Sequence, residues 1–260
     1  MKFLILNVIF FGAALVSILA TWGVIGLLRR RALFDLPNQR SSHDIPTPLG
    51  GGLAVVPVVL VFWVALALLS ISESPRVLTL SVAGGALVLA IVSWIDDLKG
   101  VSSVIRLIIQ YLVVIFILAL PSESRPTFQG LAPLWLDKTL TAILWVWFIN
   151  LFNFMDGIDG IASVETLSIG LGITLLAWTI EWHPLGQYQA LVLAGAAVGF
   201  LWWNWSPAKV FFGDVGSVPL GFLLGWLLLT LAGHGFWAPA IILPLYHLVD
   251  ATLTLLERLA

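Results

Sequence analysis

The sequence predicts an all-α fold, a polytopic membrane bundle of about nine transmembrane helices that forms one domain over residues 1–260. Two observations carry this prediction. Of the 260 residues, 60% are hydrophobic and only 10% are charged, a balance far from that of a soluble domain. Long apolar runs also recur along the whole chain, and each approaches the roughly 20 residues that a spanning helix needs.

Nine apolar runs, separated by short polar breaks, are the candidate spans. The first is interpreted as a spanning helix and not as a signal peptide, because the run is too long and no Ala-x-Ala-like cleavage site follows it. The seventh and eighth runs are short and rich in glycine. The nine lie near residues 3–28, 51–71, 77–95, 104–120, 138–154, 161–180, 188–203, 217–232 and 238–256.

Basic residues predict the orientation of the bundle. Those that follow odd-numbered spans outnumber those on the other side by eight to four, which places the first group in the cytoplasm. The amino terminus is then outside and the carboxyl terminus cytoplasmic. The eight are Arg29, Arg30, Arg31, Arg40, Lys99, Arg106, Lys209 and Arg258, and the four are Lys2, Arg76, Arg125 and Lys138.

Composition also excludes some classes of function. The chain contains no cysteine, so neither a disulfide framework nor a thiolate metal site can form. The formal net charge of −2 gives no signal for nucleic acid as a partner. Aspartates instead gather on the predicted cytoplasmic side, in four different connections. They are Asp35, Asp44, Asp96, Asp97, Asp156, Asp159 and Asp214.

The first cytoplasmic connection, RRRALFDLPNQRSSHDIPTPLGGG, ends in the run Gly50 to Gly52. Its prolines and glycines favour either a shaped loop whose backbone amides approach a ligand closely or a flexible basic loop at the lipid headgroups. His43 is the one histidine on the acidic side. With no second histidine beside it, it does not form a histidine-based metal site.

Two acidic motifs flank helix ends. Asp96 and Asp97 end the third span, where they act either as a polar stop or, because adjacent carboxylates repel, in binding a metal or a proton. Gly213-Asp214-Val215-Gly216-Ser217 precedes the eighth span. This turn suits either a phosphate-bound cation or a simple helix cap.

The stretch Asn150 to Gly160, NLFNFMDGIDG, joins the fifth and sixth spans. Asn150, Asn153, Asp156 and Asp159 fall at steps of three, so a helical interpretation places them roughly on one face. Four polar groups at the end of an apolar run predict a binding or catalytic site.

Taken together and in order, Asp-Asp, Asn-x-x-Asn-x-x-Asp-Gly-x-Asp-Gly and Phe-x-Gly-Asp-x-Gly-Ser resemble the polyprenyl-phosphate N-acetylhexosamine-1-phosphate transferase superfamily. With RSSHDIPTPLGGG in the first loop, the closer branch looks like the bacterial undecaprenyl-phosphate sugar-1-phosphate transferases and not the muramoyl-pentapeptide enzyme. The resemblance implies transfer of a sugar 1-phosphate from a UDP-N-acetylhexosamine-type sugar to undecaprenyl phosphate, with release of UMP. It also implies Mg²⁺ or Mn²⁺ as cofactor.

The resemblance implies roles for matching positions. Asp96 and Asp97 would lie near the lipid phosphate, one of them a candidate catalytic base, although direct attack without a base is the alternative. Asp214 would bind the metal. Substrate-binding roles fall on Asn150, Asn153, Asp156, Gly157, Asp159, Asn204, Phe211, Gly213, Ser217 and His43. Of these, Asn204 and Phe211 match positions that hydrogen-bond and stack on uracil, and Gly213 and Ser217 shape the turn around the metal.

The resemblance also sets the expected location and the departures from the family. The protein is expected in the bacterial cytoplasmic (inner) membrane, among membrane lipid, and a homodimer is left open. Family members usually continue with a histidine-containing cytoplasmic loop and a last helix after the ninth span. The chain is expected to lack both, which leaves the sugar and the glycan pathway undetermined.

Three other classes are weighed. CDP-alcohol phosphotransferases place an Ala-Arg pair soon after the first Asp-Gly, and DGIDGIASVE has no such arginine. A membrane transporter would bury its acids near the midplane and show internal repeats, which this chain does not. A non-catalytic relative that binds the lipid and the nucleotide sugar is the remaining alternative.

Overall fold

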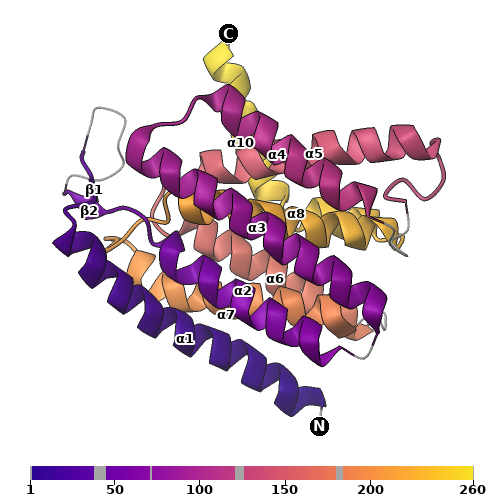
Figure 1. Cartoon of the computed structure of the whole chain (residues 1–260), viewed down its shortest axis with the longest axis horizontal. Coiled ribbons are helices and arrows are strands. Elements are labelled where there is room, and N and C mark those ends of the chain that lie inside the picture. The colour runs from indigo at the N-terminus through magenta and orange to yellow at the C-terminus, as the bar shows by residue number, and fades with distance from the viewer. Residues whose placement is uncertain (1, 38–44, 71, 121–125, 180–183, 260) are drawn as a thin grey trace.

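The computed structural model describes residues 2–37, 45–70, 72–120, 126–179 and 184–259, which form a helix bundle (Figure 1). Two short strands, β1 Phe34–Asp35 and β2 Thr47–Pro48, pair antiparallel in the first connection. The helices are α1 Lys2–Arg30, α2 Gly52–Leu69, α3 Glu73–Lys99, α4 Ser103–Ala119, α5 Leu134–Met155, α6 Ile161–Thr179, α7 Pro184–Asn204, α8 Asp214–Gly233, α9 Trp237–Ile242 and α10 Leu245–Leu259.

Seven of the described helices are long and apolar enough to cross a membrane. These are α1, α2, α3, α5, α6, α7 and α8, while α4 is a shorter apolar helix of 17 residues. The predicted class, an all-α polytopic membrane protein, is confirmed. The count of nine spans and the orientation of the termini stay predictions.

The continuous ninth helix expected over 238–256 is wrong, because the structure divides this stretch into α9 and α10. The break falls at Leu243 and Pro244. Proline has no N–H to donate to the preceding turn, and its fixed φ suits the start of a helix. The chain therefore ends one short helix before Pro244 and begins another after it.

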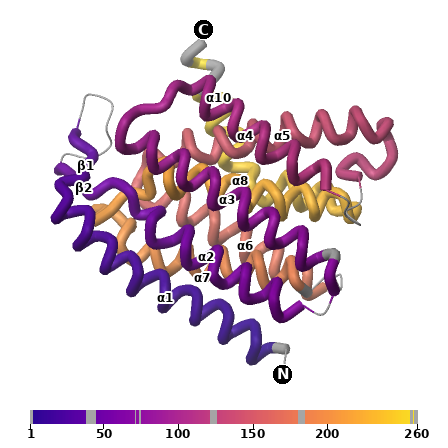
Figure 2. Tube along the Cα trace, viewed as in Figure 1, coloured from indigo at the N-terminus to yellow at the C-terminus, as the bar shows by residue number. Residues whose placement is uncertain are grey.

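Helix α8 is the central element and α1 lies along one edge (Figures 1 and 2). In the most apolar stretch of α8, 83% of the residues are buried, against 28% in α1. Glycines allow this enclosure: a Cβ on Gly221 would press on Ile149 and Phe152, and one on Gly225 would lie 2.7 Å from the Trp145 ring. The glycine content of the eighth run thus reflects close packing at the centre.

The connections that carry the sequence motifs contact one another at one end of the bundle. The first connection reaches the segment 205–213, because the Gly51 amide donates to the Phe211 carbonyl. The end of α3 reaches the start of α8 through Asp97, and the turn after α5 reaches the end of α7 through Gly160 and Asn204. Residues far apart in the sequence therefore meet at this end.

Candidate active site

The carboxylate of Asp97, near the end of α3, caps the start of α8. Its two oxygens accept the backbone N–H groups of Asp214 and Val215, each at 3.0 Å. The first N–H groups of a helix have no partner within the helix, and a negative charge there also favours the helix dipole. Gly213 at the N-cap has no side-chain capping bond of its own, so another helix supplies the cap of α8, and the binding of a cation at this turn stays a prediction.

Gly213 is the residue that this cap requires. Its φ of +71° lies in the left-handed region, which side chains disfavour. A Cβ at this position would also lie 2.9 Å from Asp97 Oδ2. Any larger residue would therefore push the capping carboxylate away from α8.

Arg106, in the first turns of α4, bridges two of the predicted carboxylates. Its Nη1 donates to Asp96 Oδ2 at 2.5 Å and to Asp214 Oδ2 at 2.7 Å. The Arg106 side chain is about one-third exposed, whereas the Asp96 side chain is 11% exposed. One cation thus lies between an acid of α3 and an acid of α8.

Asn153, near the end of α5, completes the polar contact with α8. Its Nδ2 donates to Asp214 Oδ1 and to Ser217 Oγ, each at 2.8 Å. The buried Ser217 hydroxyl in turn donates to the Gly213 carbonyl at 3.1 Å. Asp214 is therefore held on one oxygen by an amide and on the other by Arg106.

Asp156 follows the last residue of α5 and is half-buried. Desolvation raises the pKa of its carboxyl group well above the usual range, and the negative charges of Asp214 and Asp97 raise it further. Four aspartates, 96, 97, 156 and 214, thus share one neighbourhood with one arginine, and they are called the acidic cluster below. The cluster carries more negative than positive charge.

The turn after α5 separates residues that the sequence predicted on one face. Because α5 ends at Met155, the steps of three do not continue as a helix, and that expectation is wrong beyond this point. Asp159 lies outside the helix, where its Oδ2 accepts the Ala208 N–H at 3.1 Å. Its Oδ1 is buried without a hydrogen-bond partner.

Asn204, at the end of α7, connects the turn after α5 to the segment 205–213 by hydrogen bonds. Its Oδ1 accepts the Gly160 N–H at 3.0 Å, and its Nδ2 donates to the Val210 carbonyl at 2.9 Å. The residue is 3% exposed. In this structure the predicted uracil-binding amide holds two loops together and does not face an open space.

The glycine run of the first connection packs against protein. The amides of Gly50 and Gly51 donate to the Phe211 carbonyl, and that of Gly52 donates to the Phe212 carbonyl. A Cβ on Gly52 would overlap the backbone of Gly216 in α8. In the described part of this connection, the backbone of the glycine run thus approaches the start of α8 closely.

The remaining predicted residues are placed differently. Asn150 faces α4, where its Nδ2 donates to Gln110 Oε1 at 2.6 Å. Gly157 is exposed and a Cβ there would meet nothing within 4 Å. Phe211 is half-buried beside the glycine run. His43 lies outside the described residues.

Comparison with known proteins identifies the family to which the residues of the acidic cluster belong. A family model described as glycosyl transferase family 4 matches residues 79–232, more than half of the chain. The chain belongs to this family. The matched range contains Asp96, Asp97, Asp156 and Asp214, so the cluster is part of the family domain.

The relatives that the chain resembles are named as N-acetylglucosamine phosphotransferases of a polyprenyl phosphate or as phospho-N-acetylmuramoyl-pentapeptide-transferases. The chain is 28% identical, over 95% of its length, to a probable undecaprenyl-phosphate N-acetylglucosaminyl 1-phosphate transferase of Bacillus subtilis. It is 31% identical, over 85% of its length, to the decaprenyl-phosphate N-acetylglucosaminephosphotransferase of Mycolicibacterium smegmatis. It is 30% identical, over 90%, to the phospho-N-acetylmuramoyl-pentapeptide-transferase of Thermosynechococcus vestitus.

These matches cover 71%, 59% and 65% of the three relatives. The predicted polyprenyl-phosphate N-acetylhexosamine-1-phosphate transferase family is confirmed, and the transporter alternative is not favoured. The identities to the two kinds of transferase are alike. The choice of the undecaprenyl-phosphate sugar-1-phosphate branch therefore stays a prediction.

The cluster suits the divalent cation that the family resemblance implies. Carboxylates and amide oxygens are the hard donors that Mg²⁺ takes, and Mg²⁺ usually binds through one or two carboxylates plus substrate phosphates. Among the described residues, no three acid or histidine side chains converge as a ligand set, so a cation here would need substrate phosphates or water for most of its ligands. Desolvation first, and the charges of Asp214 and Asp97 second, raise the pKa of Asp156, and a bound cation would offset the second of these causes.

Two polar residues of α4 were missed as site residues by the sequence reasoning. Arg106 was used only to orient the bundle, and Gln110 was not considered. They are four residues apart in an otherwise apolar helix, so they share one face. A cation and an amide on one face of an apolar helix are expensive in a membrane, and this signal was available in the sequence.

Proposed function

We propose that the protein transfers an N-acetylhexosamine 1-phosphate from a UDP-sugar to undecaprenyl phosphate at the cytoplasmic face of the bacterial inner membrane. An oxygen of the lipid phosphate attacks the sugar-bearing phosphorus of the donor. A new P–O bond forms, the P–O bond to the uridine phosphate breaks, and UMP leaves. The observation that supports this proposal is the acidic cluster, which combines unbalanced carboxylates with one bridging arginine at a junction of four helices.

The negative charge of the two substrates means that the site must supply positive charge. Both substrates carry phosphate charge, and in phosphoryl transfer positioning and electrostatic stabilisation do most of the work. A bound Mg²⁺ would neutralise the phosphates, and Asp214 is the residue that would hold it, as the family resemblance also implies. Arg106 lies beside the same carboxylate and contributes further positive charge.

The acceptor needs little help from a base. The second pKa of a phosphate monoester is about 6, so near neutral pH most of the lipid phosphate is already dianionic. Asp97 is held by two backbone N–H groups and Asp96 by Arg106. We therefore assign Asp96 and Asp97 to positioning α8 and Arg106, and the direct attack of the lipid phosphate becomes the simpler mechanism.

The donor would lie against the turn after α5 and the segment 205–213. Gly157 is exposed there and Phe211 is half-buried, so both can face a nucleotide. Asn153 orients Asp214. Asp159 and Asn204 connect the turn after α5 to the end of α7 and the segment 205–213. Their roles toward the nucleotide would then be indirect.

The test measures UMP release by purified membranes that contain the protein. UMP is expected from UDP-N-acetylglucosamine only when undecaprenyl phosphate and Mg²⁺ are both supplied. Asp214→Asn is expected to lower this lipid-dependent rate at least about 100-fold, as loss of a main electrostatic contact typically does. Asp250→Asn is the matched control, because this carboxylate lies in α10 outside the cluster.

Two outcomes would reject the proposal. UMP release at the same rate without the lipid acceptor would show hydrolysis instead of transfer. Undiminished lipid-dependent turnover by Asp214→Asn, with equal protein in the membrane, would remove Asp214 from the metal role.

A further inference from the structure

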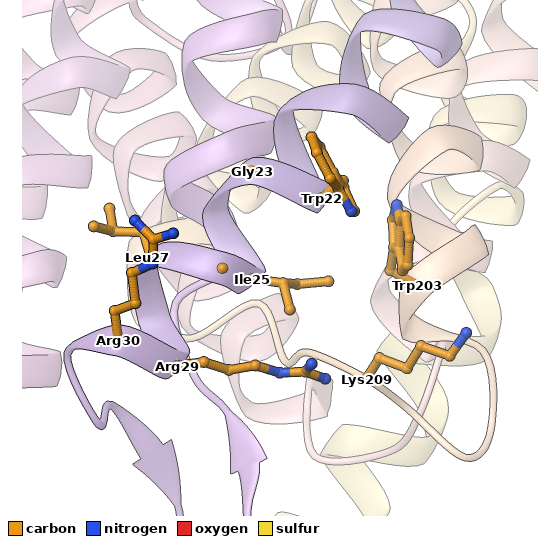
Figure 3. Close-up of a pocket in the computed structure, with 9 residues that line it drawn as sticks. Trp22, Gly23, Ile25, Leu27, Arg29, Arg30, Trp203 and Lys209 are labelled. Carbon is orange, nitrogen blue, oxygen red and sulfur yellow. The ribbon is translucent and has the colours of Figure 1, made fainter.

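A cavity of about 530 Å³ lies between the end of α1, the end of α7 and the segment 205–213 (Figure 3). None of its lining residues belongs to the acidic cluster. Two tryptophans, Trp22 and Trp203, stand on its two sides, and Arg29 extends below Ile25 toward Lys209. The family comparison and the proposed transfer reaction assign no role to this cavity.

The way α1 and α7 cross creates the cavity. Near their crossing the two helices touch closely, because a Cβ on Gly195 or Gly199 of α7 would overlap the α1 backbone. The Trp203 Nε1–H donates to the Ile18 carbonyl at 3.1 Å and links the two helices beside the cavity. Beyond it the helices part, and a Cβ on Gly23 or Gly26 would meet nothing within 4 Å.

The cavity holds positive charge without a matching negative charge. Arg29, Arg30 and Lys209 line it, and none of these three side chains is in any of the ion pairs found between described residues, which join Arg106 to Asp96 and Asp214 and His247 to Glu165. The Lys209 ammonium lies 5.4 Å from the centre of the Trp203 ring, a cation–π distance. Its charge is thus held beside the Trp203 ring, at the edge of the cavity. Such a cavity suits an anion.

The surroundings identify an amphiphilic anion. Helix α1 has 29 residues and spans about 43 Å at 1.5 Å per residue, so its last turn extends past a hydrocarbon core of about 30 Å. Leu15, Leu19 and Trp22 on its outer face are 57%, 58% and 68% exposed. Apolar surface thus leads directly to the basic end, where tryptophan is typical of the membrane interface.

We propose that this cavity binds the phosphate group of an anionic membrane phospholipid, with the acyl chains lying along the outer face of α1. Basic pockets between spanning helices are suited to lipid headgroups. The occupant would also steady the segment 205–213, because Lys209 neighbours Ala208, whose N–H is held by Asp159. The lipid site and the acidic cluster would then share this segment.

Native mass spectrometry of the full chain in neutral detergent tests the proposal. The delipidated protein is titrated with phosphatidylglycerol or with phosphatidylcholine of the same acyl chains. Each basic side chain near a membrane surface favours anionic lipid by about fivefold in affinity. The double variant Arg29→Gln/Lys209→Gln is therefore expected to bind phosphatidylglycerol about 25-fold more weakly, with its phosphatidylcholine binding unchanged.

The matched control is Arg31→Gln/Lys138→Gln, which removes the same charge from two residues outside the cavity and is expected to bind like the unchanged protein. Three results would overturn the proposal: equal binding of the two lipids, unchanged binding by the cavity variant, or an equal loss in the control. Displacement of phosphatidylglycerol by an equal concentration of inorganic phosphate would overturn the assignment to a lipid.

Folding of the variants does not limit the test. Arg29 and Lys209 are both exposed, and each is also replaced singly, with an expected loss of about fivefold for each. Melting temperature is the second readout, since a ligand that binds the folded state stabilises it. Phosphatidylglycerol should raise the melting temperature of the control and not that of the double variant. An equal rise in both would contradict the proposed site.

Discussion

The acidic cluster and a second group of ionisable side chains inside the bundle differ in charge balance. The acidic cluster brings four aspartates to one arginine. Elsewhere, Glu165 of α6 faces His247 of α10, with 3.3 Å between Oε2 and Nδ1. The Glu165 and His247 side chains are 9% and 1% exposed, against 28% for Asp214 and 34% for Arg106.

The difference in charge balance and exposure separates a candidate binding site, the acidic cluster, from a structural contact, the Glu165–His247 pair. The Glu165–His247 pair is nearly closed to solvent, and its charges balance when His247 is protonated, although Glu165 Oε1 and His247 Nε2 are buried without a hydrogen-bond partner. A partly exposed group with surplus negative charge remains costly until a cation or a substrate joins it. Charge balance, and not burial alone, therefore distinguishes the candidate active site from the Glu165–His247 pair.

The largest expected effect on stability comes from breaking the closed pair. His247→Leu leaves the Glu165 carboxyl group buried without its partner, which is expected to lower the free energy of unfolding by about 3 kcal/mol or more. Denaturant unfolding in detergent measures this. The double variant Glu165→Met/His247→Leu should recover most of the loss, because apolar pairs of similar volume often replace buried ion pairs without cost.

The double variant also tests the comparison itself. Its lipid-dependent turnover per folded molecule should stay close to that of the unchanged protein. If stability recovers and turnover is lost, the pair belongs to the active site and the distinction drawn from charge balance is wrong.

A smaller loss is expected from Arg106→Met, which removes the one positive charge between Asp96 and Asp214. Because these groups are partly exposed, we expect a decrease of about 1–2 kcal/mol in the free energy of unfolding. Added Mg²⁺ should restore part of this loss, since a divalent cation can replace the missing charge. Arg31→Met at the exposed end of α1 is the control. Equal unfolding curves for the two variants, with and without Mg²⁺, would refute the bridging role.

The smallest effect, and of opposite sign, is expected from Asp156→Asn. The pKa of Asp156 is raised in the folded state, so the folded protein holds this proton more tightly than the unfolded chain. Ionisation of Asp156 then lowers stability as the pH rises from the ordinary value of 3.8 through the raised pKa. Asparagine removes this loss, so the variant should melt at a higher temperature than the unchanged protein at pH 7.

This gain should shrink as the pH falls toward 3.8 and should vanish only well below 3.8, where the carboxyl group is protonated in both states. Melting curves over this pH range, with Asp250→Asn as the control, measure it. A gain that persists unchanged at low pH would mean that packing, and not charge, produces it.

The sequence predicted helices well where apolar length alone decides them. Eight of the nine runs correspond to α1 through α8. The ninth failed because Pro244 interrupts it, a local signal that the apolar run obscured. The sequence also could not show that the glycine-rich eighth run is the central helix, since that depends on neighbours such as Trp145 and Phe152 closing on Gly221 and Gly225.

The candidate site was predictable in its residue types and less so in its contacts. The positions of Asp97 and Asp214 beside helix ends follow from topology, yet the cap between them joins residues 117 apart. Periodicity shows which residues share a helix face but not which helix covers that face. Arg106 was therefore assigned to orientation, and Asn150 to the substrate, although it pairs with Gln110 in the structure.

The cap from Asp97 onto α8 also has a consequence for biosynthesis. A ribosome completes α3 more than a hundred residues before it makes the first turn of α8. The carboxylate that satisfies the leading amides of α8 is thus already in the membrane when that helix is inserted. A fragment that begins at Asp214 would insert with these amides uncapped, and co-expression of α1 through α3 would supply the missing acceptor.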